Sequence, residues 1–119
     1  MTTDTAPDSS GPSTDQPVAV GSESELDDLV ESNDVVLADF YADWCGPCQM
    51  LAPIVERIAA ETDATVAKID VDANQALAAT YGVRGVPMLA LFADGEQVQE
   101  IVGLQPEERL RSLVESHLE

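Results

Sequence analysis

Two cysteines, Cys45 and Cys48, stand three positions apart with only a glycine and a proline between them. They follow a strongly apolar segment, residues 35–41, and precede a segment with helical periodicity. Three positions are nearly one helical turn, so the two sulfurs lie close enough to form a disulfide. The unpaired amides and the dipole at a helix start stabilise a thiolate on Cys45. The spacing therefore indicates thiol–disulfide exchange with Cys45 as the attacking sulfur.

Three other uses of these thiols compete with the redox interpretation. A structural disulfide would contribute little, because so short a loop removes little entropy from the unfolded chain. A four-ligand zinc site would need carboxylates and the single histidine, His117, to complete it. Two inert buried thiols are disfavoured, since Gly46 and Pro47 at a strand-to-helix turn favour an exposed segment. Redox exchange is the preferred interpretation, and we expect no metal site.

The segments around the cysteine pair are predicted to alternate between strands and helices. The expected strands cover residues 18–20, 35–41, 66–71, 88–92 and 97–102, and the expected helices follow Ser22, cover 46–61 and 74–81, and begin at Pro106. This order is typical of an α/β fold, a central mixed sheet with helices on both faces. The apolar face of the helix over 46–61 is expected to carry Met50, Leu51, Ile54, Val55 and Ile58.

Length, charge and composition limit the class of protein. The chain has 119 residues, enough for one ordinary domain. Its 23 acidic and 5 basic side chains give a net charge of −18, so nucleic acid and anionic membranes are poor partners. Acids dominate, lysine is nearly absent and aromatic residues are few, as in proteins of salt-accumulating halophiles. Residues 1–17 are predicted to form a disordered acidic tail, and residues 18–119 the folded domain.

Neither a membrane span nor a targeting segment is expected. No run of apolar residues approaches the length that a membrane helix needs. Residues 1–24 contain no Lys or Arg and no apolar core of a signal peptide. We therefore expect a cytoplasmic protein.

Several segments together resemble the thioredoxin family, in order and at the spacing of that family. They are Asp39–Cys48, Ala52-Pro53, Lys68–Asp72, Tyr81–Pro87 and Phe92–Gly95. The resemblance covers about residues 18–119. It implies the thioredoxin fold, with about five strands flanked by four helices. It also implies a monomeric electron carrier without cofactors that reduces disulfides in client proteins and is reduced again by a thioredoxin reductase.

The resemblance assigns roles to four residues of the redox centre. Cys45 matches the exposed nucleophile, Cys48 the buried resolving thiol, Asp39 the buried acid beneath it, and Lys68 the basic neighbour of that acid. Independently, a carboxyl in the middle of an apolar strand should be desolvated and have a raised pKa, which suits a proton acceptor. The alternative for Asp39 is an acid at a strand end that reaches water.

The family's docking surface for clients can be carried over in the same way. Its residues would be Trp44, Gly46, Pro47, Val86, Pro87, Val102 and Gly103, with Val86-Pro87 matching the family's cis-proline turn. Each of these residues alone is equally consistent with ordinary packing. The sequence departs from the family pattern at Gln49, where Lys or Arg is common, and at Tyr41, where many bacterial members carry Trp.

Two rival functions remain open at this stage. One is a disulfide oxidant or isomerase, against which the Gly-Pro pair between the cysteines argues by family likeness. The other is a binding module that holds a partner on the apolar surface without redox chemistry.

Overall fold

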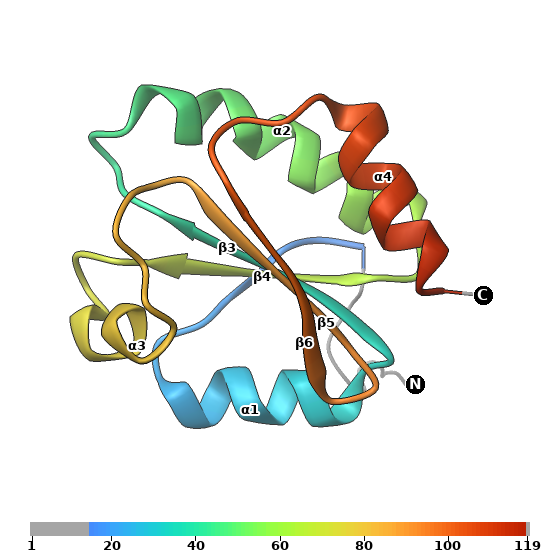
Figure 1. Cartoon of the computed structure of the whole chain (residues 1–119), viewed down its shortest axis with the longest axis horizontal. Helices are drawn as coiled ribbons and strands as arrows, with labels where there is room; N and C mark the ends of the chain where they lie inside the picture. The colour runs from blue at the N-terminus through green and yellow to red at the C-terminus, as the bar shows by residue number, and fades with distance from the viewer. Residues whose placement is uncertain (1–14, 119) are drawn as a thin grey trace, which may run out of the picture.

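The computed structural model describes residues 15–118, so nearly all of the predicted tail, residues 1–17, lies outside the described part. A five-stranded sheet forms the centre of the molecule (Figure 1). Its strands lie in the order β2 (Val18–Ala19), β4 (Thr65–Asp70), β3 (Val35–Tyr41), β5 (Met88–Ala93) and β6 (Glu96–Val102). The first three strands are parallel, and β5 and β6 are antiparallel to their neighbours, which confirms the mixed sheet.

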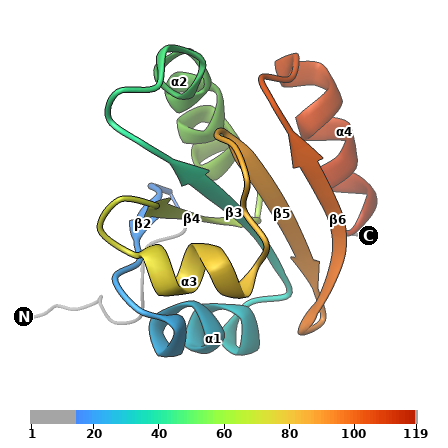
Figure 2. The same ribbon diagram turned by 60° about the vertical axis from the view of Figure 1, so that its left-hand side comes forward.

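Four helices cover the two faces of the sheet (Figures 1 and 2). They are α1 (Glu23–Ser32), α2 (Gly46–Glu61), α3 (Gln75–Thr80) and α4 (Glu107–Ser116). One apolar core lies between the sheet and the pair α1 and α3, and a second lies between the sheet and the pair α2 and α4. The predicted thioredoxin fold is thus confirmed within the described residues.

The central strand β3 supplies side chains to both cores. Val36, Ala38 and Phe40 belong to the core under α1 and α3. Val35 and Leu37 belong to the core under α2 and α4. Because successive side chains of a strand point to opposite faces, Asp39 lies on the face covered by α2. The strand therefore directs its one carboxyl toward the helix that carries the cysteines.

Local sequence signals explain how the elements begin and turn. The Ser22 hydroxyl caps α1 by accepting a hydrogen bond from the Glu25 amide at 3.1 Å. The Glu25 carboxylate accepts from the Gly21 amide, one residue earlier than in the usual capping box. Asp94 and Gly95 both have positive φ, as a two-residue hairpin of type I′ requires.

One side chain of α2 does not lie where the sequence predicted. Met50 is 63% exposed, whereas Leu51, Val55 and Ile58 are buried. The three buried residues follow one stripe at helical spacing, and Met50 lies about 100° to the side of that stripe. The predicted apolar face was therefore too wide.

Within residues 15–118, no helix has the length and apolar character that crossing a membrane requires.

Candidate redox site

The two cysteines form a disulfide at the start of α2. Their Cα atoms are 5.2 Å apart. Cys45 is the N-cap residue of the helix, and its Sγ accepts a hydrogen bond from the Cys48 amide at 3.1 Å. The sulfur thus satisfies one of the unpaired amides of the first turn, where a negative charge is favoured. This is the helix-end geometry that the spacing predicted.

Solvent exposure does not distinguish the two sulfurs, contrary to the expectation of an exposed Cys45. Cys45 is 4% exposed and Cys48 is 3% exposed. Both pack with Ala42, and with Tyr41, Val71 and Val86 at the edge of this small cluster. In the disulfide each sulfur covers part of the other. The difference between the two cysteines lies in their position on the helix.

Asp39 is wholly buried beneath this site. Neither carboxylate oxygen has a hydrogen-bond partner. The nearest cation is the Lys68 ammonium, whose Nζ lies 3.8 Å from Oδ2. Burial raises the pKa of Asp39 from 3.8 to about 6, although the charge of Lys68 acts in the opposite direction. The predicted desolvated carboxyl is present, and the alternative in which Asp39 reaches water is wrong.

Lys68 reaches Asp39 from the neighbouring strand. The two residues are paired in the register of β3 and β4. The Lys68 Nζ also lies 4.3 Å from the centre of the Tyr41 ring, in cation–π geometry. In the sequence, Tyr41 stood out only as a departure from the family. Its position two residues after Asp39, on the same face of the strand, was the signal for this contact.

A cavity of about 170 Å³ lies between Lys68 and Tyr41 on one side and the start of α2 on the other. Its wall contains the following residues: Tyr41, Ala42, Asp43, Cys48, Gln49, Ala52 and Lys68. Such a volume has room for water. The Gln49 side chain donates a hydrogen bond to the Asp43 carbonyl at 2.9 Å. Gln49, which stands where the family commonly has Lys or Arg, therefore stabilises this wall of the cavity.

Four of the predicted docking residues adjoin the disulfide: Trp44, Gly46 and Pro47 are next to the cysteines in the chain, and Val86 packs against them. Trp44 is 71% exposed, and its indole Nε1 donates to the Asp72 carboxylate at 2.9 Å. Gly46, Pro47 and Val102 are exposed, and Val86 and Gly103 are half-buried. The role of Asp72 in holding the indole was not anticipated from the sequence, because the two residues are 28 positions apart.

Pro87 is the exception in this group, because it is buried. The Val86–Pro87 peptide bond is cis. The Pro87 carbonyl accepts a hydrogen bond from the Gly103 amide at 2.8 Å. Pro87 leads directly into the buried strand β5, which explains its burial and confines it to shaping the loop.

Residues 15–118 contain no cluster of three or more His, Cys, Asp or Glu side chains that is placed to hold a metal ion.

Comparison with known proteins identifies the family. The thioredoxin family model matches residues 17–116. A thioredoxin of Staphylococcus saprophyticus is 46% identical over 98 residues, covering 81% of this chain and 93% of the relative.

Solved structures give the same result. A mutant thioredoxin from Halobacterium salinarum superposes with a TM-score of 0.88 at 67% identity, over 92% of this chain and 96% of that one. Fasciola hepatica thioredoxin superposes with a TM-score of 0.78 at 35% identity, over 84% and 98%. The Halobacterium match agrees with the halophile-type composition. The chain belongs to the thioredoxin family and is a thiol–disulfide oxidoreductase.

Proposed function

We propose that this thioredoxin reduces client disulfides in two exchange steps. The Cys45 thiolate attacks one sulfur of the client disulfide, which forms a mixed disulfide and releases the other client sulfur as a thiolate. The Cys48 thiolate then attacks the Cys45 sulfur. This step closes the Cys45–Cys48 disulfide and releases the second client thiolate, so that two electrons pass from the dithiol to the client.

The observation that carries this assignment is the asymmetry of the helix start. Cys45 caps α2 and accepts a hydrogen bond from the Cys48 amide, so a thiolate at Cys45 is stabilised by both the amide and the helix dipole. Cys48 lies within the first turn and lines the cavity that also reaches Lys68. Cys45 is therefore suited to attack, and Cys48 to resolution.

Asp39 is proposed to accept the proton that Cys48 loses. A carboxyl with a pKa of about 6 changes its protonation close to neutral pH, as a general base requires. Water in the cavity lined by Cys48 and Lys68 would relay the proton. Lys68, at 3.8 Å, limits the rise in the pKa of Asp39.

The client is proposed to dock over the disulfide. The docking surface comprises Trp44, Gly46, Pro47, Val86, Val102 and Gly103, with Pro87 supporting the loop beneath it. A thioredoxin reductase would return the protein to its dithiol form. We further propose that the protein works as a cytoplasmic monomer without a resident cofactor, and that residues 18–119 are the active domain and residues 1–17 a separate tail.

The reduction potential tests the direction of the reaction. A reducing thioredoxin should have a potential near about −270 mV, whereas about −120 to −180 mV would indicate an oxidant or isomerase. Reduction of insulin with a chemical reductant provides the activity assay. The double variant Cys45→Ser, Cys48→Ser should be inactive in this assay. The same variant tests the rival function in cells, because a protein that acted only by binding a partner would keep its cellular function without either thiol.

A further inference from the structure

Within residues 15–118, five large apolar side chains are exposed on the surface, and four of them lie on the segments 44–50 and 102–104 near the redox site. They are Trp44, Met50, Val98, Val102 and Leu104. Trp44 and Val102 belong to the proposed docking surface. Met50 and Leu104, which are 63% and 40% exposed, lie outside that surface and have no part in the exchange steps.

Met50 and Leu104 face each other across a groove of about 380 Å³. Its wall consists of Met50, Ile54, Leu104, Gln105 and Pro106, none of which is charged. The two walls come from α2 and from the connection between β6 and α4, which Figure 1 shows running beside α2. Although the chain has a net charge of −18, an apolar group can bind in this groove without contacting an acidic side chain of its wall.

Both sides of the groove continue from the docking surface. On α2, Gly46, Met50 and Ile54 follow one another at intervals of four residues and so lie on adjacent turns of one side of the helix. On the other side, Val102 and Gly103 run directly into Leu104. The groove is thus an extension of the surface around the disulfide. It continues along α2 from Gly46 toward Ile54, whereas Trp44 precedes the helix.

We propose that this groove binds an apolar side chain of the client, two to three residues from the cysteine that Cys45 attacks. The inference rests on the proposed function, because attack at Cys45 places the client chain over this end of α2. Met50 stands five residues after Cys45, which is about 7.5 Å along the helix axis. An extended peptide spans about 3.3 Å per residue and covers that distance in about two to three residues.

The groove's lining sets the kind of side chain that fits. A leucine or methionine gains from removal of its apolar surface from water, and the flexible thioether of Met50 adapts to different shapes. A carboxylate would lose hydration without meeting a cation in the wall. The groove therefore selects clients with an apolar residue at this spacing over clients with an acidic or small polar one.

Two disulfide-bridged model peptides test the proposal, identical except for leucine or serine three residues from the cysteine. The readout is the ratio of kcat/KM for the leucine peptide to kcat/KM for the serine peptide. In the unaltered protein this ratio should be well above one. Met50→Gln and Leu104→Gln should each lower it by about threefold to tenfold, the loss expected for partial burial of one apolar side chain.

Val98→Gln is the matched control, because Val98 is an exposed apolar residue of β6 outside the groove. It should leave the ratio unchanged. A ratio that is unaffected by either groove substitution, or that Val98→Gln lowers equally, would overturn the proposal. A small aromatic disulfide, too small to reach the groove, tests the proposed function separately: failure of the unaltered protein to reduce it would contradict the redox mechanism itself.

Discussion

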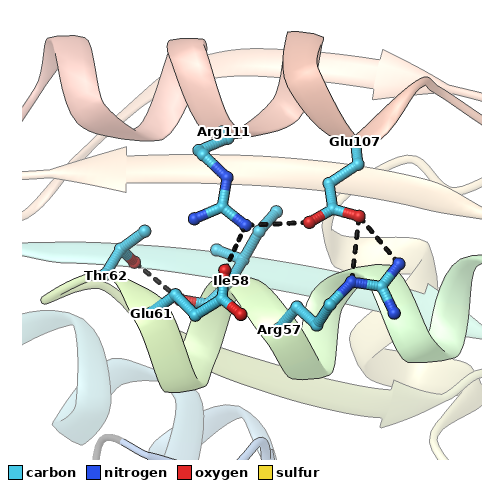
Figure 3. A network of polar contacts seen from close by, with 6 residues as sticks. All are labelled: Arg57, Ile58, Glu61, Thr62, Glu107 and Arg111. Atoms are coloured by element: carbon cyan, nitrogen blue, oxygen red, sulfur yellow. Dashed lines mark hydrogen bonds and ion pairs between the residues drawn. The ribbon is translucent and has the colours of Figure 1, made fainter.

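Two ionic arrangements within residues 15–118 differ in burial and in hydrogen bonding. Beneath the disulfide, Asp39 and Lys68 approach to 3.8 Å, and the carboxylate has no hydrogen bond. At the surface, Arg57 and Arg111 bind Glu107 at 2.7 and 2.8 Å, and Arg111 also binds Glu61 at 2.6 Å (Figure 3). This surface network joins α2 to α4.

The two arrangements shift their carboxyl groups in opposite directions. Hydrogen bonds from Arg57 and Arg111 lower the pKa of Glu107 from 4.5 to about 2. Burial raises the pKa of Asp39 from 3.8 to about 6, despite the nearby ammonium. Hydrogen bonds from two cations thus lower the pKa of the surface carboxyl, whereas at the buried pair the cost of burial outweighs the charge of Lys68. The network is suited to holding two helices together, and the buried pair to exchanging a proton.

Salt should change the stability of the whole molecule strongly, and the direction of the change shows whether the paired charges or the excess of acidic charge dominates. The network should weaken in salt, but the net charge of −18 repels itself across the whole molecule at low ionic strength. We expect the melting temperature to rise by about 10 °C or more from dilute buffer to molar KCl, with disulfide reduction persisting. Thermal melts across that series measure it. A flat or falling trend would mean that paired charges dominate.

Asp39→Asn should change the kinetics of one step selectively. The variant removes the proton acceptor and keeps the side chain's shape, so release of the client from the mixed disulfide should slow by about tenfold or more at neutral pH. The initial attack by Cys45 should change less. Rapid-mixing measurements of the two phases separate these effects, and equal slowing of both would show that Asp39 does not act on Cys48.

The same variant should be more stable than the unaltered protein, in a pH-dependent way. The folded pKa of about 6 exceeds the ordinary value of 3.8, so charging Asp39 costs stability fully above about pH 6 and not at all below 3.8. The difference between the two pKa values corresponds to an increase on the order of 3 kcal/mol in the free energy of unfolding of the variant at high pH. Denaturant unfolding at both ends of the range tests this. A variant that is less stable at pH 8 would show that Asp39 belongs to a satisfied ionic network.

Glu107→Gln should have a smaller effect of opposite sign. The folded pKa of about 2 lies below the ordinary 4.5, so the stability that Glu107 contributes is present above pH 4.5 and is lost as the pH falls toward 2. The variant should melt a few degrees lower at neutral pH, and this difference should shrink on acidification. Glu108→Gln, at an exposed acid outside the network, is the control. A deficit of the same size in both variants would show that the network does not join the helices.

Sequence patterns predicted what depends on neighbours along the chain. The apolar run of residues 35–41 located β3 to the residue, and Ser22 and Asp94-Gly95 marked a helix start and a hairpin. The family resemblance named Asp39 and Lys68 as neighbours, and the structure places them 3.8 Å apart, with Lys68 and Cys48 in the wall of one cavity.

What the sequence did not show depends on contacts between distant segments. The bonds from Arg57 to Glu107 and from Arg111 to Glu61 each span 50 positions, and only the Glu107–Arg111 pair, four residues apart, was visible as a helical spacing. Exposure was missed for the same reason. Met50 is exposed and Pro87 is buried because of how whole elements pack, which periodicity along one helix or loop does not specify.

The distinct roles of the two sulfurs are the central claim, and trapping of mixed disulfides tests them most directly. Each single variant, Cys45→Ser and Cys48→Ser, is reduced, mixed with a client that carries one disulfide, and examined for a covalent complex by non-reducing electrophoresis and mass spectrometry. Cys48→Ser should accumulate the complex, since Cys45 still attacks and nothing resolves the product. Cys45→Ser should not accumulate it. Equal trapping by both variants, or more by Cys45→Ser, would contradict the assignment of Cys45 as the attacking sulfur.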